Sequence, residues 1–68
     1  MISRIIGRNV KRLRREKGYS QEQLALEAEI SPSILRMIER GEANPTIKTL
    51  GKLAVSLGTT VEEFMKKG

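Results

Sequence analysis

The side chains best suited to specific recognition fall on one face of a short predicted helix near the middle of the chain. With Leu35 and Ile38 pointing inward, the opposite face carries four side chains at spacings of three, four and seven residues: Ser33, Arg36, Met37 and Arg40. The planar guanidinium of Arg36 can donate two hydrogen bonds to O6 and N7 of guanine, which is worth about 1–3 kcal/mol of discrimination between bases. Ser33 can donate or accept a hydrogen bond and so specifies less. This face is therefore a candidate for contacting the edges of DNA bases.

Two short helices joined by a tight turn must hold this face in place. Ser20 and Gln23 form an S-x-x-Q capping box, which predicts the start of the first helix. Ser31 suits the N-cap of the second helix, Pro32 suits its first position, and Gly41 suits the left-handed residue after its end. The residues expected to face the core from this pair are Leu24, Ala25, Ala28, Leu35 and Ile38. So short a turn makes the two helices cross steeply, and the second helix of such a pair can lie in a DNA major groove.

A longer amphipathic helix is predicted before this pair, over residues 3–17. Its inward stripe consists of Ile6, Val10 and Leu13. Gly18 suits the residue that ends this helix. The adjacent Tyr19 is expected to pack as an apolar plug, with an exposed stacking role as the alternative.

Two further helices are predicted after the pair. The first begins after the N-cap Thr46 and ends at Gly58. Its apolar stripe consists of Ile47, Leu50, Leu53, Ala54 and Leu57. Gly51 within it costs about 1 kcal/mol relative to alanine, which indicates either close backbone packing or simple tolerance. Thr60 and Glu63 form a second capping box before a short last helix. The inward residues of that helix are expected to be Val61, Phe64 and Met65.

The composition favours a binding domain over an enzyme. The 68 residues contain no histidine, cysteine or aspartate, so the usual general bases, nucleophiles and metal ligands are missing. We therefore expect no catalysis, no cofactor, no metal and no small-molecule ligand. Disulfides are impossible without cysteine, so helix packing must stabilise the chain. The sequence predicts an all-α fold of five helices without strands, in a single domain over residues 1–68.

The net charge of +5 indicates an acidic partner, and it is unevenly distributed. Residues 1–19 hold seven basic residues and one acidic residue, whereas the rest of the chain has a net charge of −1. The basic first helix could attract a polyanion over a long range, or it could be only a solvated helix face. No apolar segment approaches the length of a membrane span, and the first ten residues show no cleavable signal pattern. We therefore expect a cytoplasmic, nucleoid-associated protein.

Three sequence motifs carry a resemblance to a known family. They are LRREKGYSQEQLA at residues 13–25, ISPSILRMIERGEANP at 30–45 and TIKTLGKLAVSLGTTVEEF at 46–64. In these motifs the chain resembles the lambda-repressor-like (Cro/XRE-type) helix-turn-helix DNA-binding domains, over about residues 10–65, with the helix-turn-helix core at residues 21–40. The chain departs from the family at Glu29, where glycine is usual in the turn. A left-handed conformation at Glu29 would cost on the order of 1 kcal/mol.

The resemblance implies where DNA would be contacted. By position, the family's base-contacting residues correspond to Pro32, Ser33, Arg36 and Met37. Polar residues are common at the position of Met37, which could touch a thymine methyl group or pack against its own domain. The expected phosphate contacts are Gln21, Arg40, Asn44, Thr46 and Lys48. Gln21 could instead be only a helix-start residue, and Lys48 only a solubilising charge.

The resemblance also implies one internal contact and one contact between copies. Arg14 corresponds to an arginine that pairs with the glutamate near the end of the third helix, here Glu39. We interpret this pair as an internal clamp between the first and third helices, the alternative being that both residues contact DNA. A homodimer, weak or induced by DNA, is expected through the surface around the last two helices. Its candidate residues are Thr60, Val61, Phe64 and Met65.

The sequence thus favours one function and leaves a second open. The first is a sequence-specific transcriptional regulator, a repressor that binds a palindromic operator in double-stranded DNA as a dimer. The alternative is a helical protein-interaction module on the same fold, with little affinity for DNA. The acidic residues near the exposed face of the third helix lend this alternative some support.

Overall fold

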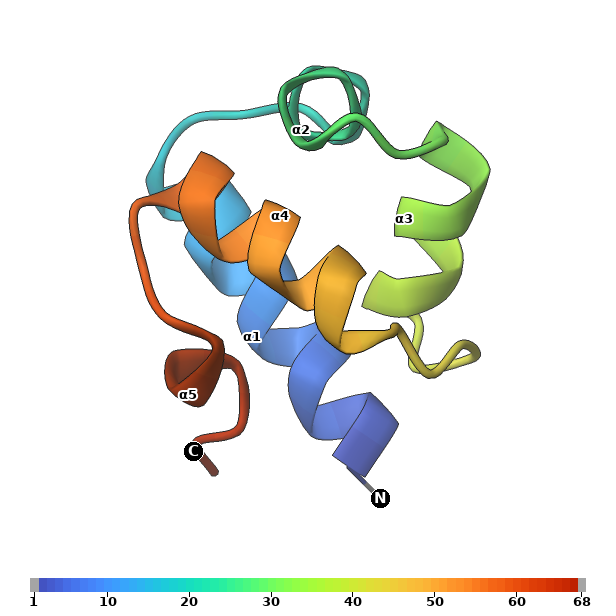
Figure 1. Cartoon of the computed structure of the whole chain (residues 1–68), viewed down its shortest axis with the longest axis vertical. Helices are drawn as coiled ribbons and strands as arrows, with labels where there is room; N and C mark the ends of the chain where they lie inside the picture. Colours follow the sequence, from blue (N-terminus) through green and yellow to red (C-terminus); the bar gives the residue numbers. More distant parts are fainter. Residues whose placement is uncertain (1, 68) are drawn as a thin grey trace.

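The computed structural model describes residues 2–67, which form five helices and no strand, as predicted. The helices are α1 (Ile2–Glu16), α2 (Gln21–Ala28), α3 (Pro32–Glu39), α4 (Ile47–Leu57) and α5 (Val61–Phe64). α1 and α4 lie one behind the other in the middle of the molecule, and α2 crosses one end of them (Figure 1). α3 and α5 lie on opposite sides of this centre. No helix within residues 2–67 is long and apolar enough to cross a membrane.

Side-chain caps fix the starts of α2, α3 and α4 where the sequence predicts them. The Ser20 hydroxyl accepts a hydrogen bond from the amide of Gln23, whose side chain accepts one from the Ser20 amide, which completes the capping box. Ser31 and Thr46 each cap their helix through the side-chain oxygen. Glu29 follows α2 with a φ of 58°. The turn between α2 and α3 therefore contains a left-handed residue that is not glycine, at a cost on the order of 1 kcal/mol.

The predicted capping box before α5 is wrong. Within residues 2–67, the Thr60 hydroxyl caps no amide of the helix. The Glu63 carboxylate lies 2.7 Å from Nζ of Lys66 instead. A cation is a stronger partner for a carboxylate than a backbone amide. Glu63 therefore pairs with Lys66 and not with the Thr60 amide, although the S/T-x-x-E pattern is present.

The core lies between α1, α2, α3 and α4 and is closed by α5. Its buried apolar residues are Ile6, Val10, Leu24, Ala25, Ala28, Leu35, Ile38, Leu50, Leu53, Ala54, Leu57 and Phe64. Tyr19 and Val61 are partly buried against it, which confirms the interpretation of Tyr19 as a plug. The prediction that Ile47 and Met65 face the core is wrong. Ile47 is 74% exposed because the buried face of α4 begins one turn later, and Met65 is 36% exposed because it follows the last turn of α5.

Asn9 joins α1 to the end of the chain, a role that the apolar pattern did not predict. Its side-chain amide is buried and donates hydrogen bonds of 2.7 Å to the carbonyl oxygens of Phe64 and Lys66. Both acceptors lie at or beyond the end of α5, where carbonyls have no intrahelical partner. Asn9 therefore holds the short α5 against α1.

Replacement of Asn9 by alanine is expected to destabilise the fold by about 1–3 kcal/mol, because it leaves the buried carbonyl of Phe64 and the partly buried carbonyl of Lys66 without their donor. Urea unfolding monitored by circular dichroism measures this loss, and proteolysis near the C-terminus should increase because α5 is released. Asn44→Ala is the matched control, since Asn44 is exposed in the loop before α4. Equal stability of the two variants would contradict the role given to Asn9.

Candidate nucleic-acid interface

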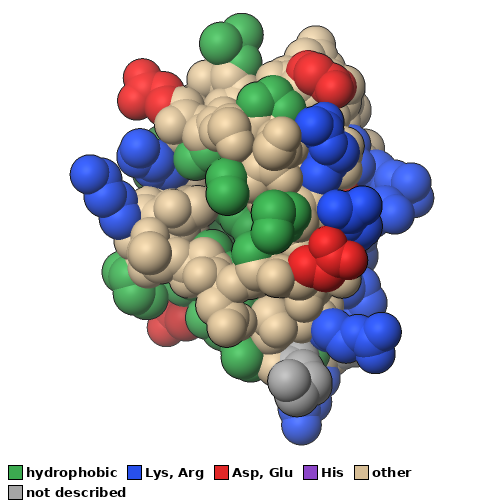
Figure 2. Space-filling model, turned by 90° about the vertical axis from the view of Figure 1, so that its right-hand side faces the viewer, with side chains coloured by type: hydrophobic (Ala, Val, Ile, Leu, Met, Phe, Trp, Pro, Cys, Tyr) green, Lys and Arg blue, Asp and Glu red, His purple; other side chains and the backbone are tan. Residues whose placement is uncertain are grey.

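The exposed face of α3 carries the side chains that the sequence identifies for base recognition. Pro32, Ser33 and Arg36 are exposed, and Met37 is at the border between half-buried and exposed. One guanidinium nitrogen of Arg36, Nη2, donates to the Ser33 hydroxyl at 3.3 Å, and the other, Nη1, lies 3.9 Å from a carboxylate oxygen of Glu22 on α2. Figure 2 faces the side of the molecule on which α3 lies, and basic side chains gather along one edge of that view. The structure thus brings the predicted base-contacting residues together on one accessible face.

The residues predicted to contact phosphates lie near this face, but they differ in exposure and in whether their side chains already have partners inside the domain. Asn44, Thr46 and Lys48 are exposed in the loop before α4 and in its first turn. Arg40 is exposed at the end of α3, where its guanidinium lies 3.1 Å from the Glu42 carboxylate. Gln21 is half-buried. Its side-chain amide belongs to an internal contact, described next.

The predicted ion pair between Arg14 and Glu39 is present and buried. Nε of Arg14 lies 2.6 Å from Oε2 of Glu39, and a second guanidinium nitrogen donates to Oε1 at 3.0 Å. The third nitrogen donates to the carbonyl of Tyr19 at 2.8 Å, and the Gln21 amide donates to Glu39 Oε1 at 2.9 Å. The side chains of Arg14 and Glu39 are only 9% and 3% exposed, so neither presents a surface to DNA. The pair joins α1, the start of α2 and the end of α3.

A close approach of two backbones also positions α3, and the apolar pattern did not predict it. Gly7 is buried in α1 directly beside the end of α3. A Cβ atom on Gly7 would overlap the carbonyl oxygen of Ile38 and lie 2.9 Å from that of Glu39. A glycine inside a long helix disfavours that helix, and this was the signal in the sequence. Gly7 allows the end of α3 to lie close enough to α1 for Arg14 to pair with Glu39.

The prediction that Phe64 contacts a second copy of the chain is wrong. The side chain of Phe64 has no exposed surface and belongs to the core, so it cannot contact a second molecule. Periodicity identified Phe64 as inward-facing, and burial excludes it from an interface. Thr60 and Met65 are exposed and Val61 is half-buried.

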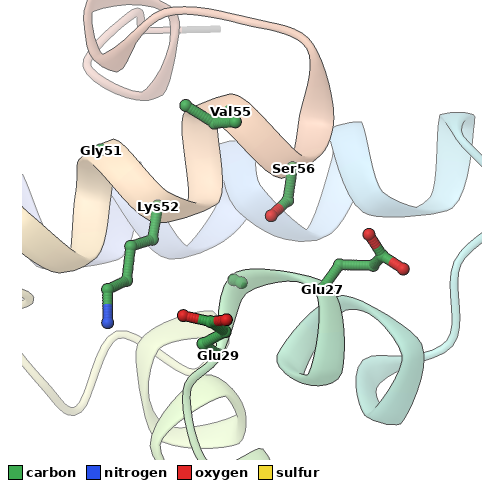
Figure 3. Close-up of a pocket in the computed structure, with 7 residues that line it drawn as sticks. Glu27, Glu29, Gly51, Lys52, Val55 and Ser56 are labelled. Carbon is green, nitrogen blue, oxygen red and sulfur yellow. The ribbon is translucent and has the colours of Figure 1, made fainter.

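A separate groove of about 440 Å³ lies between α2 and α4. Figure 3 shows Lys52 and Ser56 of α4 pointing toward α2, with Glu27 and Glu29 on the opposite side and Val55 pointing away. The groove is open and mostly apolar, and it carries charges of both signs. It holds none of the residues predicted for base or phosphate contact.

Comparison with known proteins identifies the family. A helix-turn-helix family model (HTH_3) matches residues 10–64. The chain is 42% identical over 64 residues to the uncharacterised HTH-type transcriptional regulator y4dJ of Sinorhizobium fredii, covering 94% of this chain and 83% of y4dJ. The chain spans less of other curated relatives, for example 36% of SutR from Escherichia coli.

Two solved structures share the fold. The restriction-modification controller protein C.AhdI from Aeromonas hydrophila superposes with a TM-score of 0.88 at 32% identity, covering 91% of this chain and 94% of C.AhdI. The biofilm regulator SinR, in a crystal structure with DNA, gives a TM-score of 0.86 at 39% identity, covering 90% of this chain and 98% of that one. By its helix-turn-helix match over residues 10–64 and by these similarities, the chain belongs to the Cro/XRE-type helix-turn-helix family, with the lambda-repressor-like fold.

Proposed function

We propose that this chain binds double-stranded DNA sequence-specifically and regulates transcription, as a repressor that occupies its operator. The observation that carries the proposal is the exposed strip of α3, which consists of Pro32, Ser33, Arg36 and Met37. It is supported by the 39% sequence identity to SinR, whose structure was determined with DNA. α3 would lie in the major groove with its N-terminal end toward the bases, where Pro32 and Ser33 lie.

Arg36 is the proposed principal base-contacting residue. Its ion pair with Glu22 is long and both side chains are largely solvated, so the pair contributes no more than about 1 kcal/mol. Exchange of this partner for a guanine edge therefore requires little free energy, while the Ser33 hydroxyl keeps the guanidinium near the N-terminal half of α3. Met37 beside it would contact a thymine methyl group.

The phosphate contacts would come from the rim of this surface. Arg40, Asn44, Thr46 and Lys48 are exposed around the end of α3 and the start of α4. Gln21 would contribute mainly through the amides at the N-terminus of α2, because its side chain already binds Glu39. These contacts would set the orientation of the domain on the duplex without selecting the sequence.

A palindromic operator would be bound by two copies, with half-sites about one helical turn, ~34 Å, apart. Thr60, Val61 and Met65 remain as candidates for the contact between copies. They form a small patch, so we propose a dimer that is weak or that forms only on DNA.

The test is selection of bound sequences from a random duplex pool at two salt concentrations. Enrichment of a palindrome with half-sites about one turn apart would support a dimeric operator-binding protein. Salt-sensitive binding without an enriched sequence would contradict sequence specificity. Absence of binding at low salt would favour the protein-interaction alternative.

Substitutions at Arg36 and Lys48 should have different effects. Arg36→Ala is expected to cost about 1–3 kcal/mol on the preferred sequence and to relax base preference at one position. Lys48→Ala should weaken binding to all duplexes alike and lower the salt slope by about 1. Titration of both variants against the selected and a scrambled duplex at several salt concentrations measures the difference. Equal effects of both substitutions on every duplex would contradict these roles.

A further inference from the structure

Four basic residues form a continuous row on the outer face of α1. Arg4, Arg8, Lys11 and Arg15, here called the basic row, follow one another at spacings of four, three and four residues, so they share one helical face. All four are exposed. Within residues 2–67 none of them lies within 4.0 Å of a carboxylate, whereas the exposed arginines Arg12, Arg36 and Arg40 each do. The positive charge of the basic row is therefore not neutralised inside the domain.

The basic row borders the edge of α1 that contacts α3. At about 100° per residue, Lys11, Arg4 and Arg15 follow Gly7 around the helix on the side away from the core. Gly7 packs directly against the backbone at the end of α3. Arg4 lies against the turn that follows α3, since a Cβ on Gly41 would be 2.9 Å from Cγ of Arg4. The basic row thus begins beside Gly41, the residue that follows Arg40 in the chain.

The side chains of α1 also leave open space between them on its outer face. Arg8, Lys11, Arg12, Arg15 and Glu16, all exposed, surround this space, which is open to solvent. Glu16 is paired with Arg12 at 3.2 Å, so the other three cations remain uncompensated. An anion within reach of several cations on flexible stems would neutralise them. A phosphate group fits this requirement in charge and in its number of acceptor oxygens.

We infer that the basic row is a second phosphate-binding surface, which contacts the sugar-phosphate backbone of duplex DNA beside the groove that α3 enters. This inference rests on the proposed function. Eleven residues of helix span ~16 Å between Arg4 and Arg15, enough to reach more than one phosphate of a strand that rises ~3.4 Å per nucleotide. Because the basic row borders the α3 face, the same duplex supplies these phosphates. They lie outside the base pairs that α3 contacts.

The test compares the double variant Arg8→Gln/Arg15→Gln with the control Lys52→Gln/Lys67→Gln, which removes the same charge from α4 and the C-terminal segment. Affinity is measured over a range of salt concentrations for the selected site alone and for the same site with long flanks. For the first variant we expect the salt slope on the long duplex to fall by about 2 per protomer, because each lost phosphate contact contributes about 0.9. On the short duplex the slope should be unchanged, and base preference should be retained on both. The melting temperature should stay the same because both arginines are exposed.

Four other outcomes would overturn the inference. An unchanged slope on the long duplex would mean that the basic row is only solvated. An equal fall for the control variant would mean that net charge, and not this surface, is responsible. Loss of binding to phosphatidylserine vesicles but not to DNA would assign the basic row to a membrane surface. Equal losses on short and long duplexes would place these residues at the site itself. If the unaltered protein binds no duplex, the proposed function fails before any variant is compared.

Discussion

Gly7→Ala is expected to destabilise the domain strongly, because it forces α1 and α3 apart. The added methyl group would overlap the carbonyl oxygen of Ile38 and lie 2.9 Å from that of Glu39. Both obstacles are backbone atoms at the end of α3, so no side chain can rotate away, and the two helices must separate. Overpacking typically costs 1–3 kcal/mol, and we expect the upper end, about 3 kcal/mol. For a domain of this size that lowers Tm by about 12–24 °C.

Gly51→Ala is the matched control for this prediction. Gly51 also lies inside a helix, but a Cβ there would meet no described atom within 4 Å. The tolerance interpretation of Gly51 therefore holds, and alanine should stabilise α4 by up to about 1 kcal/mol. Thermal unfolding of the two variants should thus shift Tm in opposite directions. A Gly7→Ala protein as stable as the unaltered one would show that α1 and α3 do not lie in backbone contact.

The difference between these glycines shows what the sequence could and could not predict. Local signals were sufficient for the helix-turn-helix unit, since Ser20, Ser31 and Thr46 cap their helices through contacts within four residues. Gly7 and Gly51 look alike in sequence because each interrupts a helix at a similar cost. Only the approach of α3 distinguishes them, and that approach depends on contacts between residues about thirty positions apart.

The same limit applies to the residues at the margins of the core. Periodicity identifies the inward faces of the helices but does not show where a neighbouring element stops covering them, so it wrongly places Ile47 and Met65 in the core. Asn9 was missed because a polar side chain at the edge of an apolar stripe resembles a solvated one. The carbonyls that it binds are more than fifty residues away. For the candidate site, helical spacing alone predicts the exposed face of α3. The internal hydrogen bond from Gln21 to Glu39 could not be predicted from the sequence, because it depends on where the end of α3 lies.

Arg14→Met should lower the free energy of unfolding by about 3–5 kcal/mol, because it leaves the Glu39 carboxylate buried without its cation. Glu39 would keep only the hydrogen bond from Gln21, and the Tyr19 carbonyl would lose its donor. Desolvation of an unpaired carboxylate is the main cost, since methionine fills a volume similar to that of the arginine stem. Guanidinium chloride unfolding measures the loss.

Two comparisons separate this cause from a general loss of charge. Arg12→Met also removes an arginine from an ion pair on α1, but the Arg12 and Glu16 side chains are 47% and 60% exposed, so the change should be within about 1 kcal/mol. Arg14→Met combined with Glu39→Leu removes both charges and should recover much of the loss, because a buried pair exchanged for apolar residues is often neutral. No recovery in the double variant would mean that packing, and not the unpaired carboxylate, causes the destabilisation.

Recovery of stability without recovery of DNA binding would show that the buried pair orients α3 in addition to stabilising the fold. The Arg14–Glu39 pair is the point where α1, the first residue of α2 and the last residue of α3 meet, and the Gln21 side chain joins it by donating a hydrogen bond to Glu39. An apolar replacement can fill that space but cannot fix the angle of α3 through directional hydrogen bonds. We therefore expect the double variant to fold with a melting temperature near that of the unaltered protein and to bind the selected duplex more weakly. In that case the buried pair serves chiefly to orient the exposed strip of α3.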